Sequence, residues 1–309
     1  MESPPATATV SRTFFLLLAS LFLNYFTDFR SHARLLPEDE VKALQAISEK
    51  LQIKDIYFTQ SFCNSNVSQN AVGDDIERNI ACSCNDTVCH ITNFVLTGQN
   101  LTGTLPAEFA NLTSLTGIDL SRNYIWGPIP TAFGQIPLTW LFLSGNRING
   151  SIPEEIADIA TLRELDLEDT LLGGPLPQKL GNMSRLYSMY ISGNNFTGTI
   201  PGTFINLKNL MDFRIDGSML SGKMPDLIGN WTYIERLGLQ GTGMNGPIPS
   251  TISRLESMTE LRISDLAGSN PEFPDLRGLT NLEYLILRNC GIIGSFPNYI
   301  AGFTELQLL

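Results

Sequence analysis

The chain has 309 residues, of which 43% are hydrophobic, and a formal net charge of −11. This length and apolar content allow one or two domains with a substantial core. A protein that binds nucleic-acid phosphates normally carries the opposite sign of charge, so the composition argues against a nucleic-acid partner.

Residues 1–33 have the organisation of a secretory signal peptide. Arg12 precedes an apolar run over residues 14–23, and Ser31-His32-Ala33 supplies a small-x-small cleavage site. The run is too short to span a bilayer comfortably, which argues against a membrane anchor. No later stretch is long and apolar enough to cross a membrane. We therefore expect cleavage after Ala33, with membrane attachment only through a segment missing downstream.

Residues 34–90 are expected to form an N-terminal cap that begins with a helix. The apolar residues Val41, Leu44, Ile47 and Leu51 recur at helical spacing, and acidic residues precede them, where they stabilise a first turn. Such a helix would cover the otherwise exposed end of the core that follows it.

Four cysteines come after this helix, at Cys63, Cys82, Cys84 and Cys89. Clustered cysteines in a secretory chain indicate two disulfides, and three pairings are possible. A zinc site is the alternative, but paired CxxC arms are absent and His90 would be the only imidazole nearby. We favour the disulfides Cys63–Cys82 and Cys84–Cys89, and we expect no metal and no cofactor.

From residue 91 to residue 309 the sequence repeats itself with a period of 24 residues and one interval of 23. The units follow the pattern L-x-x-L-x-L-x-x-N-x-L-x-G-x-I-P, in which other apolar residues replace leucine. The eighth unit departs from it, because it lacks G-x-I-P and has Phe273-Pro274 instead. The units start at Ile91, Leu115, Leu138, Leu162, Leu186, Leu210, Ile234, Met258, Leu282 and Leu306. Nine units are complete and the tenth stops at Leu309, which we interpret as a truncation.

One such unit cannot fold by itself. About seven apolar side chains contribute roughly 1.5–3 kcal/mol each, whereas ordering the backbone costs roughly 1–2 kcal/mol per residue. Stacking against neighbouring units must supply the difference. The sequence therefore predicts a leucine-rich-repeat solenoid of the α/β class, a right-handed superhelix with a parallel sheet on its concave face. In the last coil we expect Leu282, Leu285, Leu287 and Phe296 to be partly uncovered.

One position of the repeat is polar, and a buried amide there can satisfy backbone groups of neighbouring coils. Asn123, Asn146 and Asn194 occupy this position. Small residues replace asparagine in other units: Thr170, Ser218, Thr242 and Cys290. Cys290 is thus expected to be a buried structural residue and not a reactive thiol.

The repeat resembles the plant-type leucine-rich repeat of receptor-like kinases. Within that group, the chain is most similar to kinases that carry a malectin-like domain after the repeats, through Cys82-Ser83-Cys84, Val88-Cys89-His90, the segment 120–124 and the segment 285–290. The resemblance implies a full-length serine/threonine kinase with a malectin-like domain and one membrane span. These 309 residues contain none of those parts.

No catalytic motif is present, so we expect this chain not to be an enzyme. Kinase H-R-D and D-F-G sequences are absent. Residues 241–246 match the dinucleotide pattern GxGxxG, but they fall at repeat positions without a surrounding strand–loop–helix unit. His90 has no partners for a hydrolytic triad.

The outward strand positions of the third to sixth units are the candidate ligand-binding surface. Aromatic residues stand there beside acidic ones, a combination common in binding hot spots, although solvated strand surface is the simpler alternative. The candidates are Trp140, Phe142, Glu164, Asp166, Tyr187, Tyr190 and Arg214. The acidic fourth unit would suit a basic or amphipathic peptide. A protein or cell-wall-derived ligand and a co-receptor ectodomain are the other partners we consider.

Eight N-x-Ser/Thr triplets mark candidate glycosylation sites, and none falls on an outward strand position. They start at Asn66, Asn85, Asn100, Asn111, Asn149, Asn182, Asn195 and Asn230. Asn111, Asn182 and Asn230 share one register position on the far side of the coil. We therefore expect a strand surface that is free of sugar.

These features together favour the extracellular recognition region of a plant receptor-like serine/threonine kinase, located at the cell surface when part of the full receptor. The alternative is a free-standing secreted repeat protein, such as an inhibitor of cell-wall-degrading enzymes.

Overall fold

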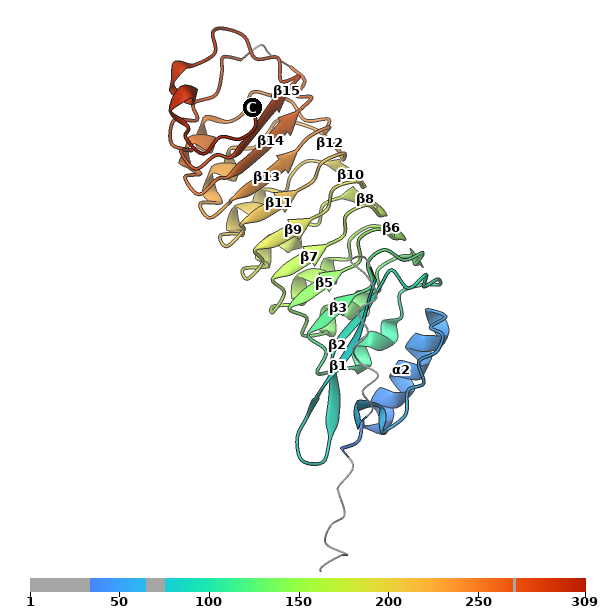
Figure 1. Cartoon of the computed structure of the whole chain (residues 1–309). Coiled ribbons are helices and arrows are strands. Elements are labelled where there is room, and N and C mark those ends of the chain that lie inside the picture. Colours follow the sequence, from blue (N-terminus) through green and yellow to red (C-terminus); the bar gives the residue numbers. More distant parts are fainter. Residues whose placement is uncertain (1–33, 65–75, 269–270) are drawn as a thin grey trace, which may run out of the picture.

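The computed structural model describes residues 34–64, 76–268 and 271–309. These residues form a stack of coils that extends along one axis, with the N-terminal helix at one end and the last strand of the main sheet near the other (Figure 1). The predicted signal peptide and Asn66 lie outside the described residues.

A ten-stranded sheet runs along the whole stack in the order β1-β2-β3-β5-β7-β9-β11-β13-β14-β15. Strands β2 to β15 are parallel, as the repeat predicts, and β1 adds an antiparallel hairpin strand at the edge. The strands are β1 (Glu77–Cys84), β2 (Cys89–Thr97), β3 (Gly117–Asp119), β5 (Trp140–Phe142), β7 (Glu164–Asp166), β9 (Ser188–Tyr190), β11 (Asp212–Arg214), β13 (Arg236–Leu239), β14 (Glu260–Ser264) and β15 (Tyr284–Arg288).

A second, five-stranded parallel sheet, which the repeat pattern did not predict, lies beside the first. Its order is β12-β10-β8-β6-β4, and its strands are β4 (Trp126–Gly127), β6 (Arg147–Gly150), β8 (Leu171–Pro175), β10 (Asn195–Gly198) and β12 (Met219–Leu220). It forms where one buried residue of each coil, such as Phe196, is flanked by outward residues such as Asn195, which is the alternation of a strand.

Short 3₁₀ helices form the remaining side of the coils, except in the eighth unit, whose described residues contain none. The residue before each of them is a proline, such as Pro130 or Pro201, whose fixed φ fits this position. These helices are η3 (Ala107–Asn111), η4 (Thr131–Gln135), η5 (Glu154–Asp158), η6 (Gln178–Asn182), η7 (Gly202–Asn206), η8 (Asp226–Asn230), η9 (Ser250–Arg254) and η10 (Asn298–Gly302).

The core is one continuous apolar column, because corresponding side chains of successive coils pack on one another. The rings of Phe109 and Phe133, which are one unit apart, illustrate this with an edge-to-face contact at a centroid distance of 5.9 Å. Phe94 packs edge to face on Phe109 within the first unit, at 5.1 Å. The first residue of each unit is fully buried from Ile91 to Leu282.

The predicted ladder of buried polar residues is confirmed. Asn146 accepts a hydrogen bond from the backbone N–H of Ile125 at 3.0 Å, and its amide donates to the carbonyls of Leu120 and Leu143 at 2.9 Å. Each asparagine of this position therefore connects its own coil to the preceding one. Cys290 occupies the equivalent place and is buried, as predicted.

The N-terminal cap is built around helix α2 (Glu38–Lys50), whose predicted apolar face is buried. Glu40 on this helix is also buried, and its carboxylate contacts His90 Nδ1 at 2.5 Å and accepts the backbone N–H of Ile91 at 3.1 Å. The buried carboxylate thus ties the helix to strand β2. A short 3₁₀ turn, η1 (Phe62–Asn64), follows the helix.

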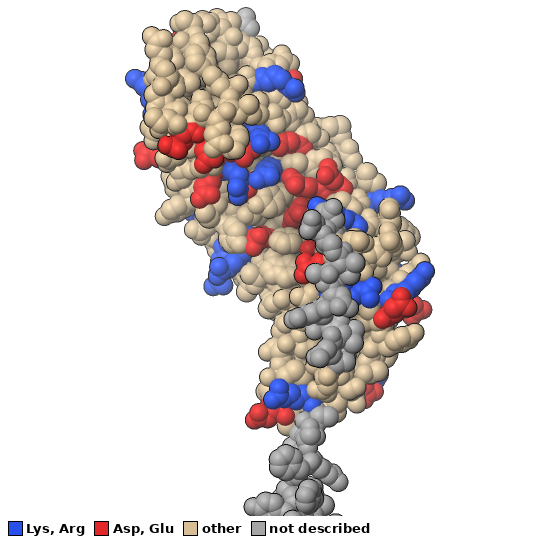
Figure 2. All heavy atoms as spheres, viewed as in Figure 1, with Lys and Arg blue, Asp and Glu red and all other residues tan. Residues whose placement is uncertain are grey.

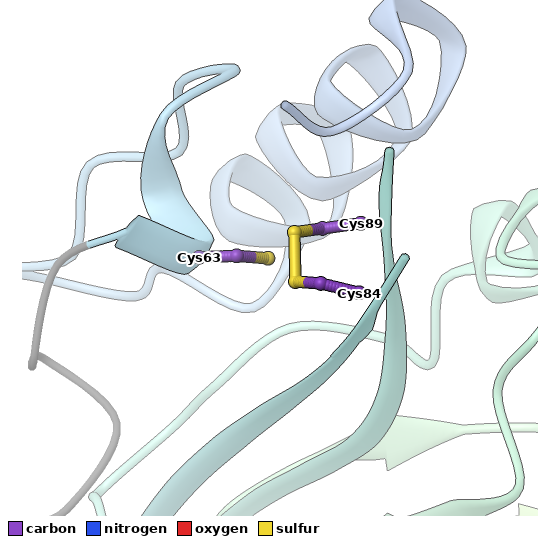
Figure 3. A group of neighbouring side chains, drawn as sticks. All are labelled: Cys63, Cys84 and Cys89. Atoms are coloured by element: carbon purple, nitrogen blue, oxygen red, sulfur yellow. A yellow bond between two sulfur atoms is a disulfide. The ribbon is translucent and has the colours of Figure 1, made fainter. Parts of the chain in front are cut away.

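The favoured disulfide pairing is confirmed, with bonds Cys63–Cys82 and Cys84–Cys89. Figure 3 shows the side chain of Cys63 directed toward the Cys84–Cys89 bond, and the three sulfur atoms lie within 4.8 Å of one another. All four cap thiols are used in disulfides, so this sulfur cluster offers no thiolate ligand to zinc.

At the C-terminal end, the expected exposure is wrong for two leucines. Leu282 and Leu285 are buried, because the start of the tenth unit covers them and the backbone N–H of Leu285 donates to the carbonyl of Leu308 at 3.0 Å. Leu287 is half-buried and Phe296 is exposed, as expected. Within the described residues, we find no helix with the length and apolarity needed to span a membrane.

Candidate ligand-binding face

The outward side chains of the ten-stranded sheet form a surface that we call the strand face. Parallel register places corresponding residues of successive coils side by side, as in the row Trp140, Glu164, Ser188 and Asp212. A second row, two residues further along each strand, contains Phe142, Asp166, Tyr190 and Arg214. Neighbouring strands lie about 4.8 Å apart, so these side chains touch from coil to coil.

Strand β5 carries the first two residues of the candidate site, and both are aromatic. The rings of Trp140 and Phe142 are half-buried, and their centroids lie 5.3 Å apart. The indole lies over Gly117 of the preceding strand, where an added Cβ would be 2.0 Å from Trp140 Cζ2. Only glycine therefore leaves room for this orientation of the indole.

Strand β7 contributes acidic side chains next to the aromatic pair. Glu164 accepts a short hydrogen bond from the hydroxyl of Tyr187, and this bond raises the pKa of Tyr187 to about 12. Asp166 accepts from Ser144 Oγ at 2.7 Å and from the backbone N–H of Glu168 at 3.0 Å. Burial raises the pKa of both Asp166 and Glu168 above their usual ranges, because it disfavours the charged form.

On the next strands of the strand face, the carboxylate of Asp212 is the shared hydrogen-bond acceptor of several side chains. Its carboxylate is buried and accepts hydrogen bonds from Arg214 at 2.9 and 3.0 Å and from Arg236 Nε at 2.7 Å. The Tyr190 hydroxyl donates to it at 3.2 Å, and the Arg214 guanidinium lies 5.1 Å from the centroid of the Tyr190 ring. One buried carboxylate thus fixes an aromatic ring and two cations.

A small hollow of about 130 Å³ lies beside this network, lined by residues that include Arg214, Asp216, Gly238 and Arg262. A side chain at Gly238 would collide with Asp216, because an added Cβ would be 2.6 Å from Asp216 Oδ2. Burial raises the pKa of Asp216. Acidic and basic side chains stand next to one another across this part of the molecule (Figure 2).

The structure brings all seven predicted face residues together on adjacent coils. Trp140, Phe142, Glu164, Asp166, Tyr190 and Arg214 lie on strands β5 to β11, and Tyr187 directly precedes β9. Asp212 was missed among the candidates, although its position two residues after Leu210 marks it as outward. Its importance comes from its partners, of which Arg214 lies on the same strand, while Tyr190 and Arg236 belong to the two neighbouring coils.

None of the candidate glycosylation asparagines that the structure describes lies on β5, β7, β9 or β11, whereas Asn149 and Asn195 lie on β6 and β10 of the second sheet. Asn85, Asn100, Asn111, Asn149, Asn182 and Asn195 are exposed. Asn230 is half-buried, and its side-chain amide donates to the carbonyl of Leu227 at 3.2 Å.

A family model described as Leucine Rich Repeat matches residues 114–136, 137–159, 185–207 and 281–303. The chain is a leucine-rich-repeat solenoid. A probable LRR receptor-like serine/threonine-protein kinase of Arabidopsis thaliana is 48% identical to the solenoid over 117 residues, which is 36% of this chain and 11% of the kinase. A second Arabidopsis thaliana protein, a probable leucine-rich repeat receptor-like serine/threonine-protein kinase, is 40% identical over 126 residues, 39% of this chain and 12% of that protein.

Solved structures agree with this relationship. The solenoid matches the LRR ectodomain of the membrane receptor kinase GASSHO1/SCHENGEN3 from Arabidopsis thaliana, in complex with CASPARIAN STRIP INTEGRITY FACTOR 2, with 28% identity and a TM-score of 0.66 over 71% of this chain and 27% of that chain. The PEPR1–AtPEP1 structure shares the fold at a TM-score of 0.73 with 24% identity, over 87% of this chain and 37% of that chain. The relatives of the solenoid are plant LRR receptor-like serine/threonine kinases, and the solenoid spans about a tenth of the length of the curated relatives it matches.

Proposed function

We propose that the solenoid is the extracellular recognition region of a plant LRR receptor-like serine/threonine kinase and that it binds a basic or amphipathic peptide on its strand face. The observation that carries the proposal is the continuous surface of the third to sixth coils, where an aromatic pair, acidic side chains and two tyrosines adjoin. Aromatic anchors next to charges are typical of peptide-binding hot spots.

The acidic coil provides the reason for choosing a basic ligand. Burial of an ionised carboxylate such as that of Asp166 destabilises the protein when no ligand is bound. A cation of the ligand would offset this destabilisation. The two aromatic rings beside them offer apolar area for a neighbouring ligand side chain. Occupancy would be transmitted to malectin-like, membrane-spanning and kinase parts of a longer protein, while the solenoid itself performs no catalysis.

Structural relatives support this choice of ligand class. The plant peptide hormone receptor RGFR1, solved in complex with RGF2, matches with 27% identity and a TM-score of 0.58 over 71% of this chain. An LRR ectodomain of this kind can therefore present a peptide-binding surface.

A short-peptide display library sorted on the secreted protein tests the proposal. Enriched peptides should carry lysine or arginine beside an aromatic or aliphatic residue. Replacing both Trp140 and Phe142 with alanine should abolish their binding, whereas Tyr233→Ala, which removes an exposed aromatic side chain outside the candidate residues, should not. Enrichment of acidic peptides, or full binding by the double variant, would contradict the proposal.

The genomic sequence downstream of Leu309 provides a second test. Malectin-like, membrane-spanning and kinase coding regions would support a receptor. A cysteine-paired C-terminal cap followed by a stop codon would favour the free-standing secreted protein.

A further inference from the structure

The outward surface of the second sheet carries a line of exposed apolar side chains. Trp126 on β4, Leu171 on β8 and Met219 on β12 are 55%, 53% and 56% exposed. These three strands are not adjacent, because β6 and β10 lie between them in the sheet. Exposed apolar side chains thus stand on every second strand of this sheet, and removing their apolar area from water would be favourable.

Both intervening strands carry a glycosylation sequon at an exposed position. Asn149-Gly150-Ser151 lies at β6 and Asn195-Phe196-Thr197 lies at β10. Apolar and sequon-bearing strands therefore alternate across the whole sheet. Each of the three apolar side chains therefore lies on a strand that is next to a strand with a sequon asparagine.

The register brings each asparagine close to the apolar side chains. Asn149 is the direct neighbour of Leu171, and Trp126 is the direct neighbour of Arg147, two residues before Asn149 on the same strand. Met219 is the direct neighbour of Thr197, two residues after Asn195. Because neighbouring strands lie about 4.8 Å apart, these apolar side chains would be within reach of a first sugar attached to either asparagine.

Gly173 is the register neighbour of the second asparagine, and the two residues lie close together. An added Cβ at Gly173 would lie 3.2 Å from Asn195 Cβ and 3.0 Å from its carbonyl oxygen. No side chain of residue 173 therefore stands between Asn195 and Leu171, which is two residues before Gly173.

We propose that N-linked glycans on Asn149 and Asn195 lie along the second sheet and cover Trp126, Leu171 and Met219. The C–H face of an N-acetylglucosamine ring is apolar and packs on indole and aliphatic side chains, while its hydroxyls remain in water. The inference rests on passage through the secretory pathway, which the proposed function includes. It assigns the two surfaces different roles, since the second sheet is covered by sugar while the strand face stays open to a ligand.

Sequon variants of the secreted protein test this inference. Ser151→Ala and Thr197→Ala remove the two sequons and keep both asparagines, while Asn149→Gln and Asn195→Gln remove them independently. Ser184→Ala is the matched control, because it removes the sequon of Asn182, whose register equivalents in the neighbouring coils are the polar residues Asp158 and Asn206.

Glycopeptide mass spectrometry measures how much of each sequon carries a glycan. The fluorescence of an apolar dye and the thermal midpoint of unfolding report whether the glycans cover the apolar side chains. Loss of both second-sheet glycans should raise dye fluorescence and lower the midpoint by about 2–4 °C, and the control should change neither. Adding Leu171→Ser to the Ser151→Ala variant should reverse part of the dye signal, because the side chain that the glycan covered is then polar.

The outcomes separate this inference from the proposed function. If Asn182 is glycosylated but Asn149 and Asn195 are not, or if their loss leaves both the dye signal and the midpoint unchanged, the inference is overturned and peptide binding is unaffected. If no sequon is occupied in the plant-expressed protein, the secretory premise fails, and the proposed function fails with it.

Discussion

Gly117 lies directly beneath the indole ring of Trp140, so close that a methyl group at residue 117 would overlap the ring. The two residues belong to neighbouring coils and share one row of the strand face. The absence of a side chain in one coil thus determines how the aromatic side chain of the next is presented. This relationship can be tested without altering the tryptophan itself.

Gly117→Ala should displace the Trp140 indole while leaving the core intact. If the ring is a ligand anchor, peptide affinity should fall about tenfold or more, since such an anchor contributes roughly 1–2 kcal/mol. Calorimetry measures the affinity, and near-ultraviolet circular dichroism reports the indole environment. Gly202→Ala is the control, because nothing lies within 4 Å of its added Cβ. Unchanged affinity together with a changed indole spectrum would remove Trp140 from the ligand site.

Asn146→Ala should destabilise the solenoid by about 2–4 kcal/mol. The substitution leaves the N–H of Ile125 and the carbonyls of Leu120 and Leu143 without their buried partner, and each such group costs about 1–3 kcal/mol. Urea unfolding measures the loss. The exposed Asn206→Ala should change stability by less than about 0.5 kcal/mol, and equal effects of the two variants would argue against the ladder.

Asp166→Asn should stabilise the protein most at neutral pH. Burial raises the pKa of Asp166, so the folded protein binds this proton more readily than the unfolded chain, and ionisation costs stability above the folded pKa. The raised pKa lies above the usual aspartate value of 3.8. As the pH falls through it, Asp166 of the wild type becomes protonated, and the difference in stability between the wild type and the variant disappears. Thermal midpoints across this range, compared for the two proteins, should converge toward acid. A gap that widens toward acid would refute this assignment.

The same substitution should weaken the binding of a basic peptide, because a cation would lose its carboxylate partner. Wild-type affinity should also fall toward acid as Asp166 and Glu168 become neutral. Affinity that is independent of pH in the wild type would place the ligand elsewhere on the face.

Removing the Cys63–Cys82 disulfide by replacing both cysteines with serine should loosen the N-terminal cap. The bond closes a loop with a sequence separation of 19, for which the chain-entropy estimate is about 3 kcal/mol. Limited proteolysis should then cut between helix α2 and strand β1 before it cuts the repeats. Cys290→Ala, which removes a thiol outside the cap, should leave that cleavage pattern unchanged.

The sequence alone determined the repeat and much that follows from it. A period of 24 residues fixed which side chains face the core, because a unit of this size must bury the same positions in every coil. Asn146 and its equivalents, the burial of Cys290 and the outward positions of Trp140 and Asp166 are all read from that register. The cap pairing Cys63–Cys82 was a preference among three possibilities.

Only the tertiary structure decided features that depend on distances between residues one coil apart. The second sheet arises from the stagger between successive coils, so the proximity of Asn149 to Leu171 could not be read from either sequence position. The space above Gly117 and the shared carboxylate of Asp212 likewise depend on which side chains the stacking places side by side. A repeat determines whether each side chain points into the core or outward. The packing between coils determines which residues of the neighbouring coils that side chain contacts.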